Sequence, residues 1–216
     1  SMAIPNLRDK FYGNLKQLYK NGEVAALQAG GNIETKAFNF VYAIFYSNAY
    51  RSRYSALLSV DFPRVPLPKS YKLLDLLAEF GEKLVSIHLI ENLKVTKFLS
   101  KRFGEGAFVI ERISYENDRV FIDSSKTKGI ASIPIDVWEF NIGGYQVCEK
   151  WLKDRGPKKG NPGRTLTDDD IIHYQKMTNS ISETIRIMGK IDELIDSYGG
   201  WPDAFITAEP NGPTDG

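Results

Sequence analysis

The first hundred residues show the spacing of amphipathic helices. Residues 7–20 carry about one apolar side chain per helical turn, which predicts a short helix. The aromatic-rich stretch that follows is apolar on more than one face. It predicts a buried helix ending near Ser47 and a shorter one over 48–58, with the aromatic residues of 38–54 in the core or on a packing surface.

A proline-rich connector separates these helices from a long one. The segment VDFPRVPLPKS (60–70) holds three prolines. Because each proline fixes φ and removes a backbone donor, we expect an extended chain here. Ser70 is a suitable N-cap for a helix that runs to about Glu91. The apolar stripe of that helix is Leu73, Leu77, Phe80, Leu84 and Ile87.

Between 105 and 142 the pattern changes to short β-rich runs. AFVIERISY, RVFID and GIASIPI are separated by ENDR and SSKTKG, whose residue types favour turns. Trp138, Phe140 and Ile142 then alternate as in a strand, and Gly143–Gly144 interrupts the alternation. Helical spacing follows from Tyr145. We therefore expect a small antiparallel sheet and a sharp strand-to-helix turn at the two glycines.

A second long helix is expected near the C-terminus. Thr167 precedes three consecutive aspartates, a pattern similar to a capping box, and acids in a first turn are favoured by the helix dipole. The apolar stripe is Ile171, Tyr174, Ile181, Ile185, Met188 and Ile195.

Together these elements predict an α+β fold, with a small antiparallel β-sheet region bracketed by two long helices and a helical N-terminal part. We expect a helical part over 1–98 and a β-rich part over 99–166. A helix over 167–198 should pack back on 69–92, and residues 199–216 should form a flexible tail.

The composition is that of a globular chain able to bury a core as one large or two small domains. The 216 residues are 42% hydrophobic and 25% charged. No apolar run approaches the roughly 18 residues of a membrane span, and the N-terminus shows no signal pattern. We therefore expect a cytoplasmic protein without membrane contact. Ser1–Met2 is typical of a cloning remnant, so we expect a fragment of a longer protein.

The residues with the strongest chemistry are few. One cysteine cannot form an internal disulfide, and with two histidines beside it a zinc site is not supported. Cys148 is expected to be a buried, apolar-like side chain. His88 and His173 are expected to be structural or solvent-facing.

Three segments match catalytic motifs only in part. The glycine-rich FGEGAF (103–108) follows a helix-like basic segment and opens a strand, the reverse of a nucleotide or S-adenosylmethionine loop, so we interpret it as a turn. NPG (161–163) lacks the second proline and the aromatic residue of an amino-methylase. Glu34-Thr35-Lys36 lacks the aspartate partner of a nuclease. We therefore predict no catalytic residue, no metal site and no cofactor in this fragment.

Charge is segregated along the chain although the net charge is only +1. Six cations face one acid between 150 and 164, whereas 165–196 carries seven acids and three cations. The loops SSKTKG and GPKKGNPGR offer residue types that donate to phosphates and base edges.

Two long blocks give the chain a family resemblance. FVYAIFYSNAYRSRYSALLSVDFPRVPLP (40–68) resembles the helix and "IPLP"-like connector of DNA-specificity regions. VWEFNIGGYQVCEKWLKDR (137–155) and GRTLTDDDIIHYQKMTNSISETIRIMGKID (163–192) are similar to the C-terminal DNA-specificity (target recognition) domain of type ISP restriction-modification enzymes. The resemblance covers about 40–198. The inserted GPKKGNP (156–162) departs from it, so no role for Lys158 and Lys159 is carried over.

The resemblance implies a function in double-stranded DNA recognition. In such enzymes, domains upstream in the same polypeptide carry the methyltransferase, translocase and nuclease, which use S-adenosylmethionine, ATP and magnesium. The C-terminal region reads the target duplex. The stretch around Gly143–Gly144 then becomes a structural junction, with a tryptophan anchoring the core and cations facing outward.

Such a domain needs phosphate contacts for affinity and base contacts for discrimination. The phosphate-binding candidates are Lys101, Arg102, Lys126, Lys128, Lys153, Arg155, Lys158, Lys159 and Arg164. The base-reading candidates are Asn117, Arg119, Ser125, Lys126 and Thr127. Two alternatives stay open: a helical protein–protein docking module without DNA contact, and a cryptic nuclease or methylase.

Overall fold

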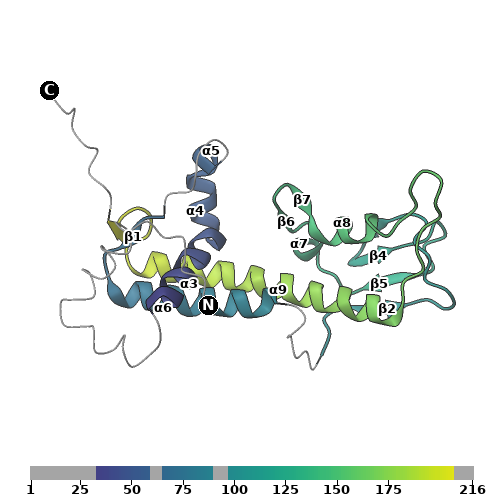
Figure 1. Cartoon of the computed structure of the whole chain (residues 1–216), viewed down its shortest axis with the longest axis horizontal. Coiled ribbons are helices and arrows are strands. Elements are labelled where there is room, and N and C mark those ends of the chain that lie inside the picture. Colours follow the sequence, from purple (N-terminus) through teal and green to yellow (C-terminus); the bar gives the residue numbers. More distant parts are fainter. Residues whose placement is uncertain (1–32, 59–64, 90–96, 207–216) are drawn as a thin grey trace, which may run out of the picture. The chain divides into compact units, whose positions relative to one another are not determined.

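The computed structural model describes residues 33–58, 65–89 and 97–206, which fall into two compact units (Figure 1). The helical unit contains the described residues up to Val85 and those from Arg186 onward, and the sheet unit is Ser86–Ile185. Both boundaries lie inside long helices, whereas the segmentation expected from the sequence is at 98/99 and 166/167. The predicted helix over 7–20 lies outside the described residues.

Among the described residues, the first helices of the helical unit are two that the sequence predicts. They are α3 (Ile33–Tyr46) and α4 (Asn48–Arg53), the latter extended by the single turn α5 (Ser55–Leu58). Ser47 separates them because its hydroxyl caps α4, accepting from Tyr50 N at 3.0 Å and donating to Asp192 Oδ1 at 2.6 Å. Phe40 and Tyr50 are buried, which confirms a core role for these aromatic residues.

The long helix α6 (Tyr71–His88) packs closely against α3. A Cβ on Gly81 would lie 1.8 Å from the carbonyl oxygen of Asn39, so the two backbones touch where only glycine fits. Lys36 Nζ bonds Asp75 Oδ1 at 2.5 Å across the same pair of helices. The predicted start of α6 directly after Ser70 is confirmed.

Part of the predicted flexible tail is ordered. Phe205–Ile206 form β8, which pairs antiparallel with β1 (Leu67–Pro68) of the connector. Trp201 stacks on Phe205 with ring centroids 4.0 Å apart and lies 5.5 Å from the buried ring of Tyr50. The prediction was wrong for 201–206 because these aromatic rings pack against the helical unit. Local sequence pattern does not predict such contacts with distant residues.

The sheet unit contains a four-stranded antiparallel sheet in the order β2-β5-β4-β3. The strands are β2 (Lys101–Phe103), β3 (Ser114–Glu116), β4 (Arg119–Phe121) and β5 (Gly129–Ala131). The predicted α+β class and antiparallel sheet are therefore confirmed. The run 107–113 contributes no strand; it pairs with the segment before α9 through the bridge Val109–Thr165.

Two local predictions in this unit were wrong. The basic segment before FGEGAF is not helical but is the edge strand β2. Trp138 does not begin a strand; it ends the helical turn α7 (Ile135–Trp138), whose Val137 N–H bonds Asp136 Oδ1 at 2.9 Å. Gly143–Gly144 join β6 (Asn141–Ile142) to β7 (Tyr145–Gln146) in a hairpin, so the strand does not turn directly into α8 (Val147–Lys153).

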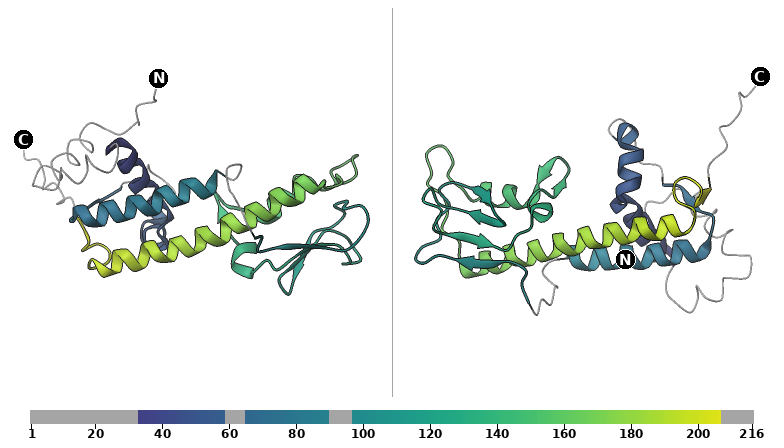
Figure 2. Two further views of the ribbon diagram at one scale, coloured as in Figure 1. Left: turned by 90° about the horizontal axis from the view of Figure 1, so that it is seen from below. Right: turned by 180° about the vertical axis from the view of Figure 1, so that it is seen from behind.

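Helix α9 (Asp168–Ser197) starts as the sequence predicts. Thr167 Oγ1 accepts from Asp170 N at 3.2 Å, and Asp170 Oδ2 accepts from Thr167 N at 2.9 Å, which completes a reciprocal capping box. The first half of α9 supports the sheet (Figure 2). Its buried stripe meets the core face of the sheet through Ile171, Tyr174, Met177 and Ile181.

The end of α6 lies against the same helix within the sheet unit. Ser180 Oγ donates to the Ile87 carbonyl at 2.8 Å, and His88 Nε2 lies 2.9 Å from Thr184 Oγ1. Burial lowers the pKa of His88. His88 is thus a structural residue, as predicted.

The contact at Gly81 gives a stability prediction. Gly81→Ala should destabilise the protein by about 1–3 kcal/mol or more, because the added methyl must displace the backbone of α3. Gly189→Ala in α9 is the matched control: apart from the backbone of its own helix, no atom lies within 4 Å of its Cβ position, and alanine should stabilise the helix by up to about 1 kcal/mol. Urea unfolding of both variants measures the difference, and equal midpoints would contradict the close approach.

Candidate nucleic-acid interface

The four-stranded sheet presents one face to the core and one outward. Because side chains alternate along a strand, the buried Val120 and Ile130 lie on the core face together with Tyr115. The opposite side is called here the outer sheet face. In register, it consists of the row Lys101, Ala131, Arg119, Glu116 and the row Phe103, Gly129, Phe121, Ser114.

Two phenylalanines and two cations occupy the middle of the outer sheet face. The Phe103 and Phe121 rings meet edge to face at 5.6 Å. They meet across Gly129, where a Cβ would lie 1.9 Å from the Val120 carbonyl oxygen. Arg119 Cζ lies 5.6 Å from the Phe103 ring centre. The charged ends of Arg119 and Lys126 thus lie over the two aromatic rings of this face.

Lys126 reaches this face from the β4–β5 loop. Its ammonium pairs with Glu116 and lies 5.9 Å from the Phe121 ring centre. Lys126 has a φ of +56°, an unusual value for a residue with a side chain. The left-handed backbone thus directs the Lys126 side chain across the outer sheet face.

The β3–β4 hairpin holds Asn117 at its tip. Glu116 and Arg119 pair across the hairpin, and both turn residues, Asn117 and Asp118, have positive φ, as in a type I′ turn. The Asp118 carboxylate accepts a hydrogen bond from Tyr115 Oη at 3.0 Å, which braces the turn. Burial and the bond to Asp118 raise the pKa of Tyr115 to about 12. Asn117 is exposed.

The buried carboxylate of Asp123 organises the β4–β5 loop. It accepts backbone bonds from Thr127 N and Lys128 N, both at 3.0 Å, and hydroxyl bonds from Ser125 at 2.8 Å and Thr127 at 2.6 Å. Burial by itself would raise the pKa of Asp123, but these hydrogen bonds outweigh it and hold the pKa well below its ordinary value. The Ser125 and Thr127 hydroxyls therefore donate inward.

A second exposed turn lies between α8 and α9. Lys158 N donates to the Asn161 carbonyl at 3.1 Å and Asn161 N donates back at 2.8 Å, so 158–161 form a tight turn with Lys158 and Lys159 exposed. Among the described residues, Lys101, Lys158 and Lys159 form no ion pair. Their ammonium groups are thus available to an anionic partner.

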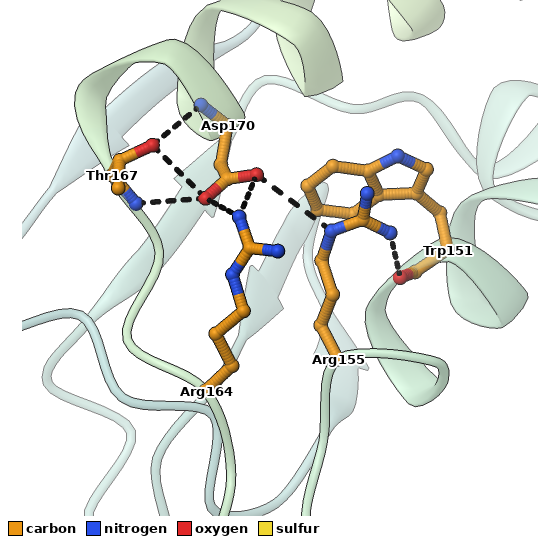
Figure 3. Close-up of polar contacts among 5 residues, drawn as sticks. All are labelled: Trp151, Arg155, Arg164, Thr167 and Asp170. Atoms are coloured by element: carbon orange, nitrogen blue, oxygen red, sulfur yellow. Dashed lines mark hydrogen bonds and ion pairs between the residues drawn. The ribbon is translucent and has the colours of Figure 1, made fainter.

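Arg155 and Arg164 of the same connection serve the fold (Figure 3). Arg164 Nη2 bonds both oxygens of Asp170, at 2.7 and 2.6 Å. Arg155 lies with Cζ 3.6 Å from the Trp151 ring centre, donates to the Trp151 carbonyl at 3.1 Å, and has Nε 3.7 Å from Asp170 Oδ1. The Asp170 carboxylate therefore fastens this connection to the start of α9.

The remaining candidates have internal partners of varied strength. Arg102 pairs with Asp168 at 2.9 Å and lies 3.9 Å from the Phe108 ring centre. Lys128 Nζ donates to the Ala107 carbonyl at 2.9 Å. Lys153 pairs with Glu149 at 2.7 Å on the surface of α8, a contact that solvent weakens.

The described residues offer no alternative site of metal chemistry. Among them, no group of three His, Cys, Asp or Glu side chains is placed to hold a metal ion, and no helix is long and apolar enough to cross a membrane. Cys148 is buried, as predicted, and burial raises the pKa of its thiol to about 12.

A family match decides the relationship of this chain to known proteins. The family described as the Type ISP C-terminal specificity domain matches residues 2–190. The chain belongs to that family. The resemblance stated from the sequence is thus confirmed, and the expected departure at 156–162 coincides with the exposed turn that carries Lys158 and Lys159.

Solved structures share the fold of this specificity domain. A nuclease-deletion mutant of the Type ISP restriction-modification enzyme LlaGI in complex with a DNA substrate mimic is 20% identical, with a TM-score of 0.55 over 72% of this chain. The ATP-dependent Type ISP restriction-modification enzyme LlaBIII bound to DNA is 17% identical, with a TM-score of 0.56 over 78%. The DrdV-DNA complex is 21% identical, with a TM-score of 0.59 over 83%.

The specificity domain corresponds to a small part of each of those chains. It covers 13% of the LlaGI chain, 12% of the LlaBIII chain and 19% of the DrdV chain. No curated protein matches the sequence.

The sequence analysis found the loops and the cap of α9 but missed the carboxylate contacts that hold the candidate side chains. Asp123, Asp170 and Glu116 each fix candidate side chains through contacts in space. The pattern Asp-x-Ser-x-Thr at 123–127 is a usable signal, because a carboxylate followed by hydroxyl residues favours such local hydrogen bonds. The pairing of Lys126 with Glu116 has no comparable local signal.

The Asp170 contacts predict an acid-sensitive stability. Burial would raise the pKa of Asp170, but bonds from Thr167 and Arg164 lower it. A lowered folded-state pKa contributes stability above the unfolded value of about 4, and that contribution is lost as pH falls through the folded-state pKa. Asp170→Asn should cost about 1–3 kcal/mol at pH 7, with the deficit shrinking below about pH 4. Urea unfolding from pH 3 to 7 measures this, and Asp169→Asn, which removes an exposed carboxylate, is the control.

The Asp123 contacts predict local rather than global loosening. Asp123→Ala removes the shared acceptor of the Thr127 and Lys128 amides, so both should exchange hydrogen at least tenfold faster. Hydrogen exchange followed by NMR reports each amide. Ser124→Ala, in the same loop but outside the Asp123 contacts, should leave both rates unchanged, and unchanged rates in Asp123→Ala would refute the organising role.

Proposed function

We propose that this specificity domain recognises a base sequence in double-stranded DNA and makes or breaks no covalent bond itself. Within a restriction-modification enzyme it would hold the target against an upstream methyltransferase and an ATP-dependent translocase and nuclease of the same polypeptide. Family membership and the DNA-bound relatives support this proposal. Cytoplasmic DNA would be its partner.

The observation that carries the proposal is the outer sheet face with its bordering turns. Arg119, Lys126 and Asn117 present charged or amide groups there, on backbone that is fixed by the sheet and by the Asp123 contacts. Rigid presentation matters because side chains ordered before binding lose less entropy when they contact a base. Discrimination between bases needs such fixed donors and acceptors.

The proposed phosphate contacts fall into two groups. Lys101, Lys158 and Lys159 are exposed and form no ion pair among the described residues. They would therefore bind phosphates without first breaking an existing ion pair. Lys126, Lys128 and Lys153 have exposed or partly exposed partners that a phosphate replaces. The three arginines of the predicted set, Arg102, Arg155 and Arg164, would act by positioning the chain through internal contacts.

The proposed base contacts come from the tip and edge of the outer sheet face. A guanidinium such as that of Arg119 can donate to guanine, and an amide such as that of Asn117 can pair with adenine. Lys126 would exchange its partner Glu116 for a base or phosphate acceptor. Ser125 and Thr127 keep acceptor lone pairs while their hydroxyls donate to Asp123, so they contribute as acceptors.

The described residues do not fit the cofactors of the larger enzyme. Magnesium would need a cluster of acidic ligands, and none is present among them. The Gly104 and Gly106 turn follows a strand but does not open a helix, so it lacks the helix N-terminus of an S-adenosylmethionine or nucleotide loop. No step of the proposed function passes through these groups.

Salt dependence separates the two kinds of contact. Replacing both Lys158 and Lys159 by alanine should weaken binding of every duplex equally. The plot of log binding constant against log salt concentration should become less steep by about 1.8, since each phosphate contact contributes about 0.9. Arg119→Ala or Lys126→Ala should instead change sequence preference, by about 1–3 kcal/mol at the affected base pair. Fluorescence anisotropy with duplexes selected from a random pool measures both quantities.

Lys190→Ala is the matched control because Lys190 is exposed and lies in the helical unit. It should change neither slope nor preference. An equal loss on all sequences in Arg119→Ala would refute the base-reading assignment. Absence of duplex binding even at low salt would replace the proposal with a protein-docking module.

A further inference from the structure

The β6–β7 hairpin carries an exposed apolar pair that no contact described above explains. Ile142 and Tyr145 lie directly opposite each other across the hairpin, on either side of Gly143–Gly144. Ile142 is 48% exposed and Tyr145 is 61% exposed. Exposed apolar side chains that gather at one tip, rather than singly, indicate a contact surface.

The base of this hairpin is firmly attached to the core. Val147 N donates to the Phe140 carbonyl at 3.0 Å, and Gln146 Nε2 donates to the Trp138 carbonyl at 2.5 Å. Trp138 is buried and stacks on Tyr115 with centroids 5.2 Å apart. The tip is therefore presented to solvent by a fixed support.

The turn at the tip of the hairpin has two glycines although its backbone could accept a residue with a side chain. Nothing lies within 4 Å of a Cβ built on either Gly143 or Gly144, so packing inside the domain does not demand glycine. The β3–β4 hairpin makes the same kind of turn with Asn117 and Asp118, at φ of +50° and +59°, close to the +58° of Gly143. Asparagine would thus serve at Gly143. A turn without side chains permits another surface to approach its backbone closely.

Positive charge continues from the hairpin along α8. Lys150 Nζ lies 5.4 Å from the Tyr145 ring centre, and Lys153 follows on the same helix. The connection then leads to the exposed turn of Lys158 and Lys159. Lys158 and Lys159 of that turn form no ion pair among the described residues, whereas Lys150, Lys153, Arg155 and Arg164 pair with Asp154, Glu149 and Asp170. These exposed lysines favour a negatively charged partner over an uncharged protein surface.

Size also distinguishes the partners. A stable protein–protein interface buries about 800 Å² on each side, far more than two side chains supply. A wedge that contacts or separates base pairs needs only one or two apolar side chains at the end of a narrow element. The hairpin has that form: two glycines at its tip, one aliphatic and one aromatic side chain behind them.

We propose that the β6–β7 hairpin is a second DNA-contacting element, whose bare Gly143–Gly144 tip enters a groove of duplex DNA. Ile142 and Tyr145 then contact the bases, and Lys150 and Lys153 contact the neighbouring phosphates, exchanging their partners Asp154 and Glu149. This inference rests on the proposed DNA recognition and adds an apolar contact to it. It also changes the role of the glycine pair from a structural junction to a contact surface.

Binding of fluorescent duplex DNA by the 216-residue chain tests this proposal. Ile142→Ala and Tyr145→Ala should each weaken binding by about 5- to 100-fold, the range of a lost base–aromatic or wedge contact. Tyr145→Phe should bind within about twofold of the unchanged chain, since the ring is retained. Gly143→Asn should fold normally, because asparagine tolerates this φ, and should weaken binding by filling the tip.

Ile172→Ala is the matched control, since Ile172 is 41% exposed in α9 of the same unit. It should bind unchanged. Circular dichroism melting should show all variants folded, because the replaced side chains are exposed.

The outcomes separate the two proposals. If the unchanged chain binds no duplex, the proposed function fails. If it binds, and the hairpin variants bind as tightly as Ile172→Ala, the proposed function survives and the hairpin inference is overturned. Unchanged DNA binding together with weakened self-association or protein association would identify the hairpin as a protein-docking element, which also overturns it.

Discussion

Burial against α9 is the constraint on which the sheet unit depends. The strands of the central sheet are three residues long, so their ladder bonds cannot hold the sheet without a buried face. The core face packs on a stripe of α9, including Ile171, Tyr174 and Ile181, which removes both surfaces from water. A long, well-capped helix therefore gives a small sheet the rigidity that an outward recognition face needs.

Carboxylates then fix the loops around that sheet. Asp123 gathers the β4–β5 loop and Asp170 gathers the connection that enters α9, each by accepting several bonds while buried. Hydrogen bonds to an ionised acceptor are stronger than neutral ones, so each of these two acids can fix the loop around it. The loops lose their conformational entropy on folding, so this loss does not reduce the free energy of binding to a partner.

The same arrangement sorts the cations by role. Arg155 and Arg164 are held by Asp170 and Trp151, whereas Lys158 and Lys159 extend from the turn between them. Arginine suits the first task because its planar group bonds a carboxylate and stacks on a ring at once. Lysine suits the second position because it is a flexible point charge that stays exposed to solvent. At the other end of α8, the hairpin of Gly143–Gly144 presents the exposed apolar side chains of Ile142 and Tyr145.

Local sequence determined the helices α3, α6 and α9, the capping of α9 by Thr167 and Asp170, the turns that join the strands, and the burial of Cys148, because each follows from spacing or from neighbouring residues. It also carried the family resemblance. Tertiary structure alone decided that Arg102 pairs with Asp168 and Lys126 with Glu116, that Trp201 and Phe205 order the tail, and that Ile142 and Tyr145 stand exposed. These outcomes join residues far apart in the chain or leave an apolar residue exposed to solvent. Periodicity identifies the residues of one element but not the partners that folding brings to it.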